Sequence, residues 1–306
     1  MIPRAYMNLT RSLMPRNARQ AVRARGRQIL NRFGCDVVSA MDPVNLCDLG
    51  LSVEDAYRRA GSLPFVMDVP VEHVRHLEAA AFPVARDGGS PFVETALQYV
   101  QNPDLGYEES ALKRFYDRFQ PQTNGDFLGL PRSPERHFLL TQHRALTLYP
   151  WDRPPLTDYR RHISDRLAGV ALENEEHGAL LDHRHGLVSS GPVSPEKGAL
   201  ELSRLKRVVD RIRESGFRHS GDVRPVRVVA LRRGESCRYL CRAGHHRVAA
   251  FSALGGTSLP VWPYPRPVVR DDVDKWPGVT AGVFSRDAAL FVFDRMFEGR
   301  QPEFGG

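Results

Sequence analysis

The sequence predicts an α+β fold, with a small mixed sheet and flanking helices in its C-terminal half and an α-rich domain before them. Two observations lead to this prediction. Apolar residues recur at helical spacing between residues 202 and 212, and a β-branched run at 225–231 is bounded by turn residues. The region before residue 186 instead mixes short helical patterns with many Pro and Gly breaks.

Four segments follow from these changes of pattern. Residues 1–35 are a basic amphipathic arm, 36–185 an uncharacterised and mostly helical domain, 186–262 an α+β domain, and 263–306 a C-terminal extension with one helix. The chain has 306 residues, 42% hydrophobic and 26% charged, which is enough for a substantial core and fits two domains. It has no transmembrane-type apolar run and no secretory signal, so we expect a cytoplasmic protein.

The formal net charge of +7 is concentrated in the arm. Residues 1–35 hold eight arginines and no acidic residue, so the other 35 basic side chains, 43 less these 8, face 36 acidic ones. The body therefore lacks the charge excess of a DNA-binding surface. The arm is a predicted amphipathic helix over about 8–33, and it suits an anionic surface such as a membrane, or docking on its own body or a partner subunit.

Two helices are predicted in the 36–185 region. One starts at Ser90-Pro91, because Ser is a good N-cap and Pro suits the first helical position. Another spans about 108–119, where apolar residues form one stripe. The segment 149–155 must be extended or turned, because its stacked prolines exclude helix, and we interpret it as an inner linker.

The C-terminal half has a clearer order of elements. A helix with one buried face ends at Gly216, and a hairpin follows. We expect its strands at 225–231 and 237–242, a helix from His245 to Gly255, a strand at 258–262 and a last helix near 285–297. Cys237 and Cys241 lie roughly 13 Å apart on one strand, so no disulfide joins them, and all four cysteines are predicted to be free thiols.

The residues best suited to bind a ligand or to take part in a reaction lie at the turn Gly244-His245-His246-Arg247. A glycine there lets the backbone approach a ligand, and the first turn of the helix presents free N–H groups at its positive end. Two imidazoles and an arginine fork add donors that match phosphate oxygens. We expect an anion to bind here. The alternative is a plain helix cap, with exposed histidines and the arginine paired with a neighbouring acid.

This order of elements around Gly-x-x-Arg, over residues 190–262, resembles the ParB/sulfiredoxin superfamily. The tetrapeptide is Gly-Glu-Arg-Arg in ParB proteins, where it grips a nucleoside triphosphate, and Gly-Cys-His-Arg in sulfiredoxins, where the cysteine does the reduction chemistry. The resemblance implies that Gly244, His246 and Arg247 contact nucleotide phosphate, with His245 at the variable position.

Two departures from the family narrow the expected activity. His245 replaces the nucleophilic cysteine, and imidazole cannot form the required sulfur linkage, so we do not expect sulfinic-acid reduction. Residues 263–306 offer one helix and no DNA-reading helix-turn-helix, which argues against chromosome partitioning. A third branch, the nucleotide-dependent kinases of free serine, fits best. It implies ATP, ADP or CTP as cofactor, with Mg²⁺ carried by the nucleotide, in a small-molecule kinase or phosphohydrolase.

Such a kinase needs a base, and the sequence offers Glu196 and Glu201, with His245 as a further candidate catalytic residue. Each glutamate is also explained as a favourable charge near a helix N-terminus. A nearby group could ligate a divalent ion or simply form a hydrophilic loop, and its spacing matches no strong zinc motif. It consists of His177, Asp182, His183 and His185.

Two other functions remain open at this level. One is a nucleotide-sensing interaction module that turns nothing over, and the other is a DNA-associated ParB-like protein or nuclease. No protein-held metal is predicted. The unknown small-molecule acceptor of a kinase has no signature in the sequence.

Overall fold

The computed structural model describes residues 43–217 and 226–302. The predicted basic arm, 1–35, and its helix lie outside the described residues. Among the described residues, no helix has both the length and the apolar character needed to span a membrane. The three cysteines in this part of the chain, Cys47, Cys237 and Cys241, are free thiols, as predicted.

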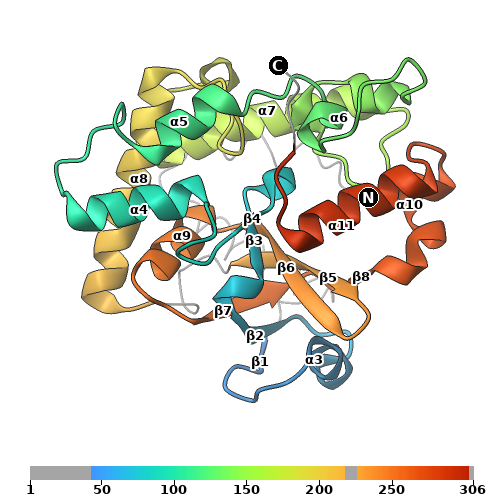
Figure 1. Cartoon of the computed structure of the whole chain (residues 1–306), viewed down its shortest axis with the longest axis horizontal. Coiled ribbons are helices and arrows are strands. Elements are labelled where there is room, and N and C mark those ends of the chain that lie inside the picture. Colours follow the sequence, from blue (N-terminus) through green and yellow to red (C-terminus); the bar gives the residue numbers. More distant parts are fainter. Residues whose placement is uncertain (1–42, 218–225, 303–306) are drawn as a thin grey trace, which may run out of the picture. The chain divides into compact units, whose positions relative to one another are not determined.

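A mixed eight-stranded sheet forms the centre of the described structure (Figure 1). The strands follow the spatial order β1-β2-β7-β5-β6-β3-β4, and β8 pairs with β5 beside β7. Their bounds are β1 Val44–Asn45, β2 Phe65–Pro70, β3 Val74–His76, β4 Phe82–Pro83, β5 Arg227–Arg233, β6 Ser236–Ala243, β7 Ser258–Pro263 and β8 Val268–Val269. The predicted mixing of helices with a mixed sheet is confirmed, and its ParB-like details stay a prediction.

The sheet joins both halves of the chain. Strands β1–β4 come from the region expected to be mostly helical, and β2 and β3 pair with β7 and β6 respectively. The boundary expected near residue 186 therefore does not divide the sheet, and contacts place Pro43–Gly306 in one unit. The early strands are two to six residues long, too short for a periodicity signal, and β2 and β3 pair with strands more than 150 positions away.

The α-helices of the described residues flank this sheet. They are α3 Val53–Ala60, α4 Pro91–Gln101, α5 Ala111–Arg118, α6 Asn124–Phe127, α7 Tyr159–Glu176, α8 Pro195–Ser215, α9 His245–Ala253, α10 Pro277–Thr280 and α11 Arg286–Glu298. Short 3₁₀ turns are η1 Val71–His73, η2 Glu78–Ala80, η3 Phe138–Thr141, η4 Arg144–Leu146, η5 His183–His185 and η6 Arg270–Lys275. In Figure 1, α4, α8 and α9 group on one side of the sheet, and α10 and α11 lie on the other.

Most predicted elements of the C-terminal half are confirmed, but the extension after residue 262 contains two α-helices, α10 and α11, where the sequence predicted one. Helix α8 ends at Gly216, β5 and β6 form the antiparallel hairpin, and α9 starts directly after Gly244. In the N-terminal half, α4 begins after Ser90 with Pro91 in its first turn, as the sequence predicts. The segment 149–155 contains neither helix nor strand, although Tyr149 is fully buried in the core.

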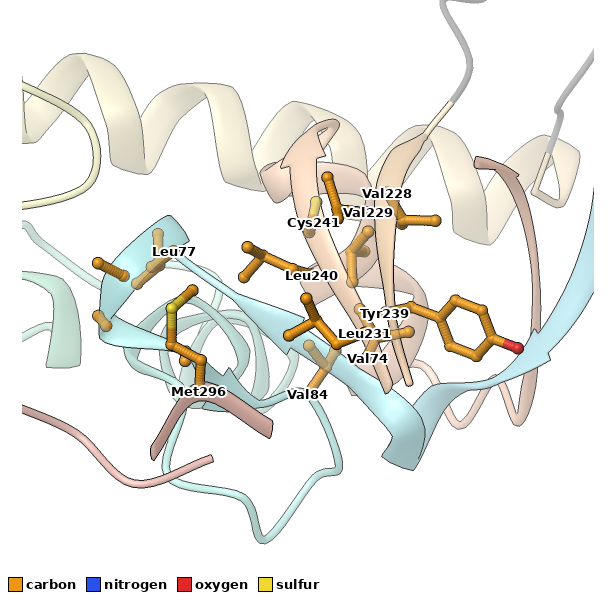
Figure 2. Packing of buried hydrophobic residues seen from close by; sticks show 14 of the residues in the cluster. Val74, Leu77, Val84, Val228, Val229, Leu231, Tyr239, Leu240, Cys241 and Met296 are labelled. Atoms are coloured by element: carbon orange, nitrogen blue, oxygen red, sulfur yellow. The ribbon is translucent and has the colours of Figure 1, made fainter. Parts of the chain in front are cut away.

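The pairing of β3 with β6 positions the candidate site. These strands are parallel, with Val74 opposite Tyr239 and Arg75 opposite Leu240. Their carboxyl ends therefore meet at one edge of the sheet, where ligands bind in open α/β sheets. Apolar residues of both strands support this register, because Val74 and Leu240 are fully buried in the core cluster that also contains Met296 of α11 (Figure 2). The chain after β3 is thereby brought to the turn after β6.

Candidate anion-binding site

The turn between β6 and α9 requires glycine at position 244. Gly244 is the N-cap of α9 with a left-handed φ of 96°, a conformation that other residues adopt at a cost. A Cβ atom there would lie 3.1 Å from both Arg247 Nη2 and Val226 Cγ2. No side chain of the described residues caps this helix, so its first N–H groups stay available to a ligand.

Two side chains at this turn hold buried polar atoms without a hydrogen-bond partner in residues 43–217 and 226–302, and a third lies against an aromatic ring. Among the described residues, His245 Nδ1 and Arg247 Nη1 are closed to solvent and make no hydrogen bond. The Arg242 guanidinium lies 4.6 Å from the centre of the Tyr149 ring, and neither Arg242 nor Arg247 forms an ion pair within the described part of the chain. Buried donors are normally satisfied, and each one left without a partner costs roughly 1–3 kcal/mol.

His246 is held differently from its neighbour. Its Nε2 lies 2.8 Å from Glu201 Oε2, so the imidazole is a close polar partner of this carboxylate. Glu201 has no exposed surface and also pairs with Lys197 and Arg204 of its own helix. Burial alone would raise the pKa of Glu201, but contact with His246 and the nearby cations hold that pKa far below its usual range.

The Glu201 network extends across three helices. Lys197 also donates to Asn174 Oδ1 at 2.6 Å, and Arg204 donates to Glu173 Oε1 at 2.7 Å, so α7 is bonded to α8. His246 adds the first turn of α9 to the same network. The sequence candidate Glu201 is thus a fully paired carboxylate that supports the turn through His246.

A strained turn presents a second carboxylate beside the anion-binding turn. Leu77, Glu78 and Ala81, around η2, have positive φ angles of 58°, 55° and 53°. Each left-handed non-glycine residue costs of order 1–3 kcal/mol and persists only where the surroundings impose it. Leu77 and Ala81 are fully buried, and Ala79 O accepts a hydrogen bond from the buried Arg295. The core therefore holds the turn that carries Glu78.

Glu78 faces the cations of the site. It is almost fully buried, and its Oε1 accepts a hydrogen bond of 2.6 Å from Arg166 of α7. Burial by itself would raise the pKa of Glu78, but the positive charges of Arg166 and Arg242 lower it to about 2. Glu78 is therefore ionised at neutral pH, and it is the carboxylate that the sheet edge brings to the anion-binding turn.

Two buried imidazoles, those of His76 and His245, also lie at this turn. His76, the last residue of β3, bonds Ser90 Oγ through Nδ1 at 3.0 Å and His245 O through Nε2 at 3.1 Å. Burial keeps the pKa of His76 well below its usual value and lowers the pKa of His245 to about 4. Both rings are neutral at pH 7, so His245 Nδ1 is able to act as a neutral donor or acceptor.

The other sequence candidates lie away from this cluster. The Glu196 side chain is 65% exposed, and its nearest charged partner is His185, at 4.0 Å. In the possible metal group, Asp182 accepts hydrogen bonds from Arg184, and His185 Nδ1 contacts Ser194 Oγ at 2.9 Å. The described residues contain no group of three His, Cys, Asp or Glu side chains that could hold a metal ion. The hydrophilic loop is the interpretation that these contacts favour.

Sequence reasoning missed four residues of the cluster: His76, Glu78, Arg166 and Arg242. The first two precede the turn by more than 160 positions and reach it only through the β3–β6 pairing. Arg166 arrives on α7, a helix without a clear apolar stripe. Arg242 had a usable signal, because it is two residues before Gly244 on the same strand.

Comparison of the chain with protein-family models, curated proteins and solved structures finds no match. The resemblance to the ParB/sulfiredoxin superfamily therefore rests on the residue pattern around Gly244 and on the order of elements alone.

Proposed function

We propose that this protein binds a nucleotide through its phosphate groups at the turn Arg242–Arg247. The observation that supports the proposal is the set of buried, unsatisfied donors on that turn, His245 Nδ1 and Arg247 Nη1, next to an uncapped helix N-terminus. A phosphate oxygen satisfies such donors, and arginine matches two of its oxygens at once. The similarity of the turn to the ParB/sulfiredoxin pattern supports a nucleotide over other anions.

Binding must be accompanied by local rearrangement in this proposal. Both donor atoms are covered in the structure, so the side chains over the turn have to move when phosphate enters. The ligand is expected to carry Mg²⁺ on its own phosphates, because the described residues offer no metal cage.

Substitution of Arg247 by Gln tests whether the turn Arg242–Arg247 binds phosphate. We expect one of ATP, ADP, CTP or GTP, screened with and without Mg²⁺, to raise the melting temperature of the native protein by roughly 5–10 °C at a hundredfold excess over Kd. Loss of a charged hydrogen-bond pair weakens phosphate binding by about 100-fold, which leaves a shift of about 1 °C in Arg247→Gln at the same concentration.

Arg207→Gln is the matched control, because it removes the same charge from an exposed position of α8. It should keep the full nucleotide shift. No shift with any of the four nucleotides, or equal shifts in the two variants, would contradict nucleotide binding at this turn.

We further propose that Glu78, and not Glu196 or Glu201, accepts the hydroxyl proton if the bound nucleotide is turned over. It is ionised and lies among the cations of the site on a strained turn, whereas Glu201 is fully paired and Glu196 is exposed. A carboxylate at such a place can take the proton late in phosphoryl transfer.

Glu78→Gln separates turnover from binding. With ATP and a panel of small hydroxyl compounds, we expect the native protein to release ADP and this variant to lose roughly 100-fold or more in rate, while it keeps a nucleotide-induced melting shift. Glu196→Gln serves as control and should retain the native rate. Turnover by Glu78→Gln at the native rate would exclude this role. Binding without turnover in the native protein would favour a nucleotide sensor.

A further inference from the structure

A cavity of about 400 Å³ lies apart from the anion-binding turn, between α4, α5 and the residues after α11. Its volume falls within the range of small-molecule sites. The residues that matter for its chemistry are Phe82, Glu94, Arg114, Phe115, Arg118 and Phe119. None of the residues of the anion-binding turn lines it.

One wall of the cavity is aromatic. The rings of Phe82 and Phe115 meet edge to face at 5.8 Å, and those of Phe115 and Phe119 stack at 5.4 Å. Phe115 and Phe119 are only 7% and 6% exposed, so the core fixes both rings, and the parts that line the cavity form a preorganised apolar wall. Such a wall suits a flat aromatic or apolar group that packs at the spacing of an aromatic pair.

Two arginines stand at the rim of the same cavity. Arg114 and Arg118 are one helical turn apart on α5, and both are exposed. Within the described residues neither forms an ion pair: Arg114 donates only to Glu109 O, at 3.2 Å. The neighbouring acid Asp117 is instead bonded to Lys113, at 2.6 Å. The two guanidinium groups therefore keep their donors available to a ligand.

The wall opposite α5 adds to this positive character. Gly89 and Pro91 line the cavity at the start of α4, an 11-residue helix. The hydroxyl of its N-cap residue, Ser90, contacts His76 and does not cap the helix, so the first backbone N–H groups of α4 have no side-chain cap, and Glu94 is the acidic residue of its first turn. Glu94 is the one acid on the lining, which leaves the excess of a single positive charge from the side chains.

We propose that this cavity binds a small monoanionic carboxylate with an aromatic or apolar body. The body packs on Phe82, Phe115 and Phe119, and the carboxylate bonds to Arg114 and Arg118 at the rim. One net positive charge against one carboxylate fits a monoanion better than a nucleotide phosphate. This site shares no residue with the anion-binding turn, so the proposal does not depend on nucleotide binding at Gly244.

The test uses 3-phenylpropionate as probe, titrated into the full chain and followed by NMR of the ligand. We expect a dissociation constant of about 1 mM for a ligand of this size. The alcohol 3-phenylpropan-1-ol lacks the carboxylate, and acetate lacks the aromatic group. Each should bind at least roughly tenfold more weakly than 3-phenylpropionate. The double variant Arg114→Gln/Arg118→Gln should weaken 3-phenylpropionate binding by roughly tenfold or more, because it removes both charged partners.

Arg207→Gln is the control, since it removes one positive charge from an exposed position of α8 that does not line the cavity. It should change the affinity less than about twofold, and an unchanged melting temperature in both variants shows that they fold. Equal binding of acid and alcohol, or equal losses in control and double variant, would overturn the proposal.

Discussion

Replacement of Glu201 by Gln should destabilise the protein by about 3–5 kcal/mol. The change keeps the shape of the side chain but removes a charge that has no exposed surface. Lys197, which is 2% exposed, and Arg204 would then lose their shared carboxylate. A buried ion whose partner is removed typically costs this much, because its desolvation is no longer offset. Urea unfolding at pH 7 measures the loss.

Glu196→Gln is the natural control for this prediction. Both glutamates lie in the first third of α8, but Glu196 is exposed, so its substitution should change the free energy of unfolding by less than about 0.5 kcal/mol. The double variant Lys197→Met/Glu201→Leu should recover part of the loss, because it removes the buried Lys197 charge together with its partner, while Arg204 keeps its ion pair with Glu173. If Glu201→Gln unfolds at the same urea concentration as Glu196→Gln, the network is not a stabilising element.

The Glu201 network also explains how the helices packed against the anion-binding turn hold it in place. It bonds α7 to α8 and reaches the first turn of α9 through His246. On the opposite side, His76 of β3 contacts the backbone of His245. The turn is therefore fixed by two elements that leave the donors of His245 and Arg247 unsatisfied within the described part of the chain. Because the backbone of the turn is held in this way, the rearrangement that phosphate entry requires is confined to the side chains that cover the two donors.

The elements after residue 186 were predictable because each carries a local signal. The apolar stripe of α8 and the glycines at 216, 244 and 255 mark boundaries that the structure confirms. The turn at Gly244 was predictable for the same reason, since a left-handed φ at a strand-to-helix junction favours glycine. Nothing local distinguished Glu196 from Glu201, because burial depends on how α8 packs against α7 and α9.

The residues that β3 and η2 bring to the site could not be predicted from local sequence patterns. β3 is three residues long, and the residues after it adopt left-handed conformations without glycine, which no propensity favours. These conformations are imposed by the burial of Leu77 and by the hydrogen bond from Arg295 to Ala79 O, both of which depend on distant packing. Glu78 thus reaches the site through tertiary structure, and the sequence offered no spacing that pointed to it.

Acid should destabilise the protein through the buried His245. Burial lowers the pKa of His245 to about 4, against 6.5 in the unfolded chain. A histidine whose folded pKa is depressed contributes stability that is fully present above pH 6.5 and is lost as the pH falls toward 4, because the unfolded chain takes up the proton first. For this shift the loss between pH 7 and pH 4.5 is about 2 kcal/mol.

The variant His245→Asn measures how much of the acid-induced loss of stability comes from His245. The pKa values of His76, whose ring packs against that of His245, and of His246 are also lowered by burial, so the native protein should lose more stability than His245 alone accounts for. Glu78, whose pKa is lowered from 4.5 to about 2, loses most of its contribution below pH 4.5. Urea unfolding at pH 7 and 4.5 should show a difference about 2 kcal/mol smaller in His245→Asn than in the native protein. The exposed His183→Asn should reproduce the native difference. Equal differences in all three proteins would mean that His245 is accessible to protons in the folded state, and the closed geometry of the anion-binding turn would then be wrong.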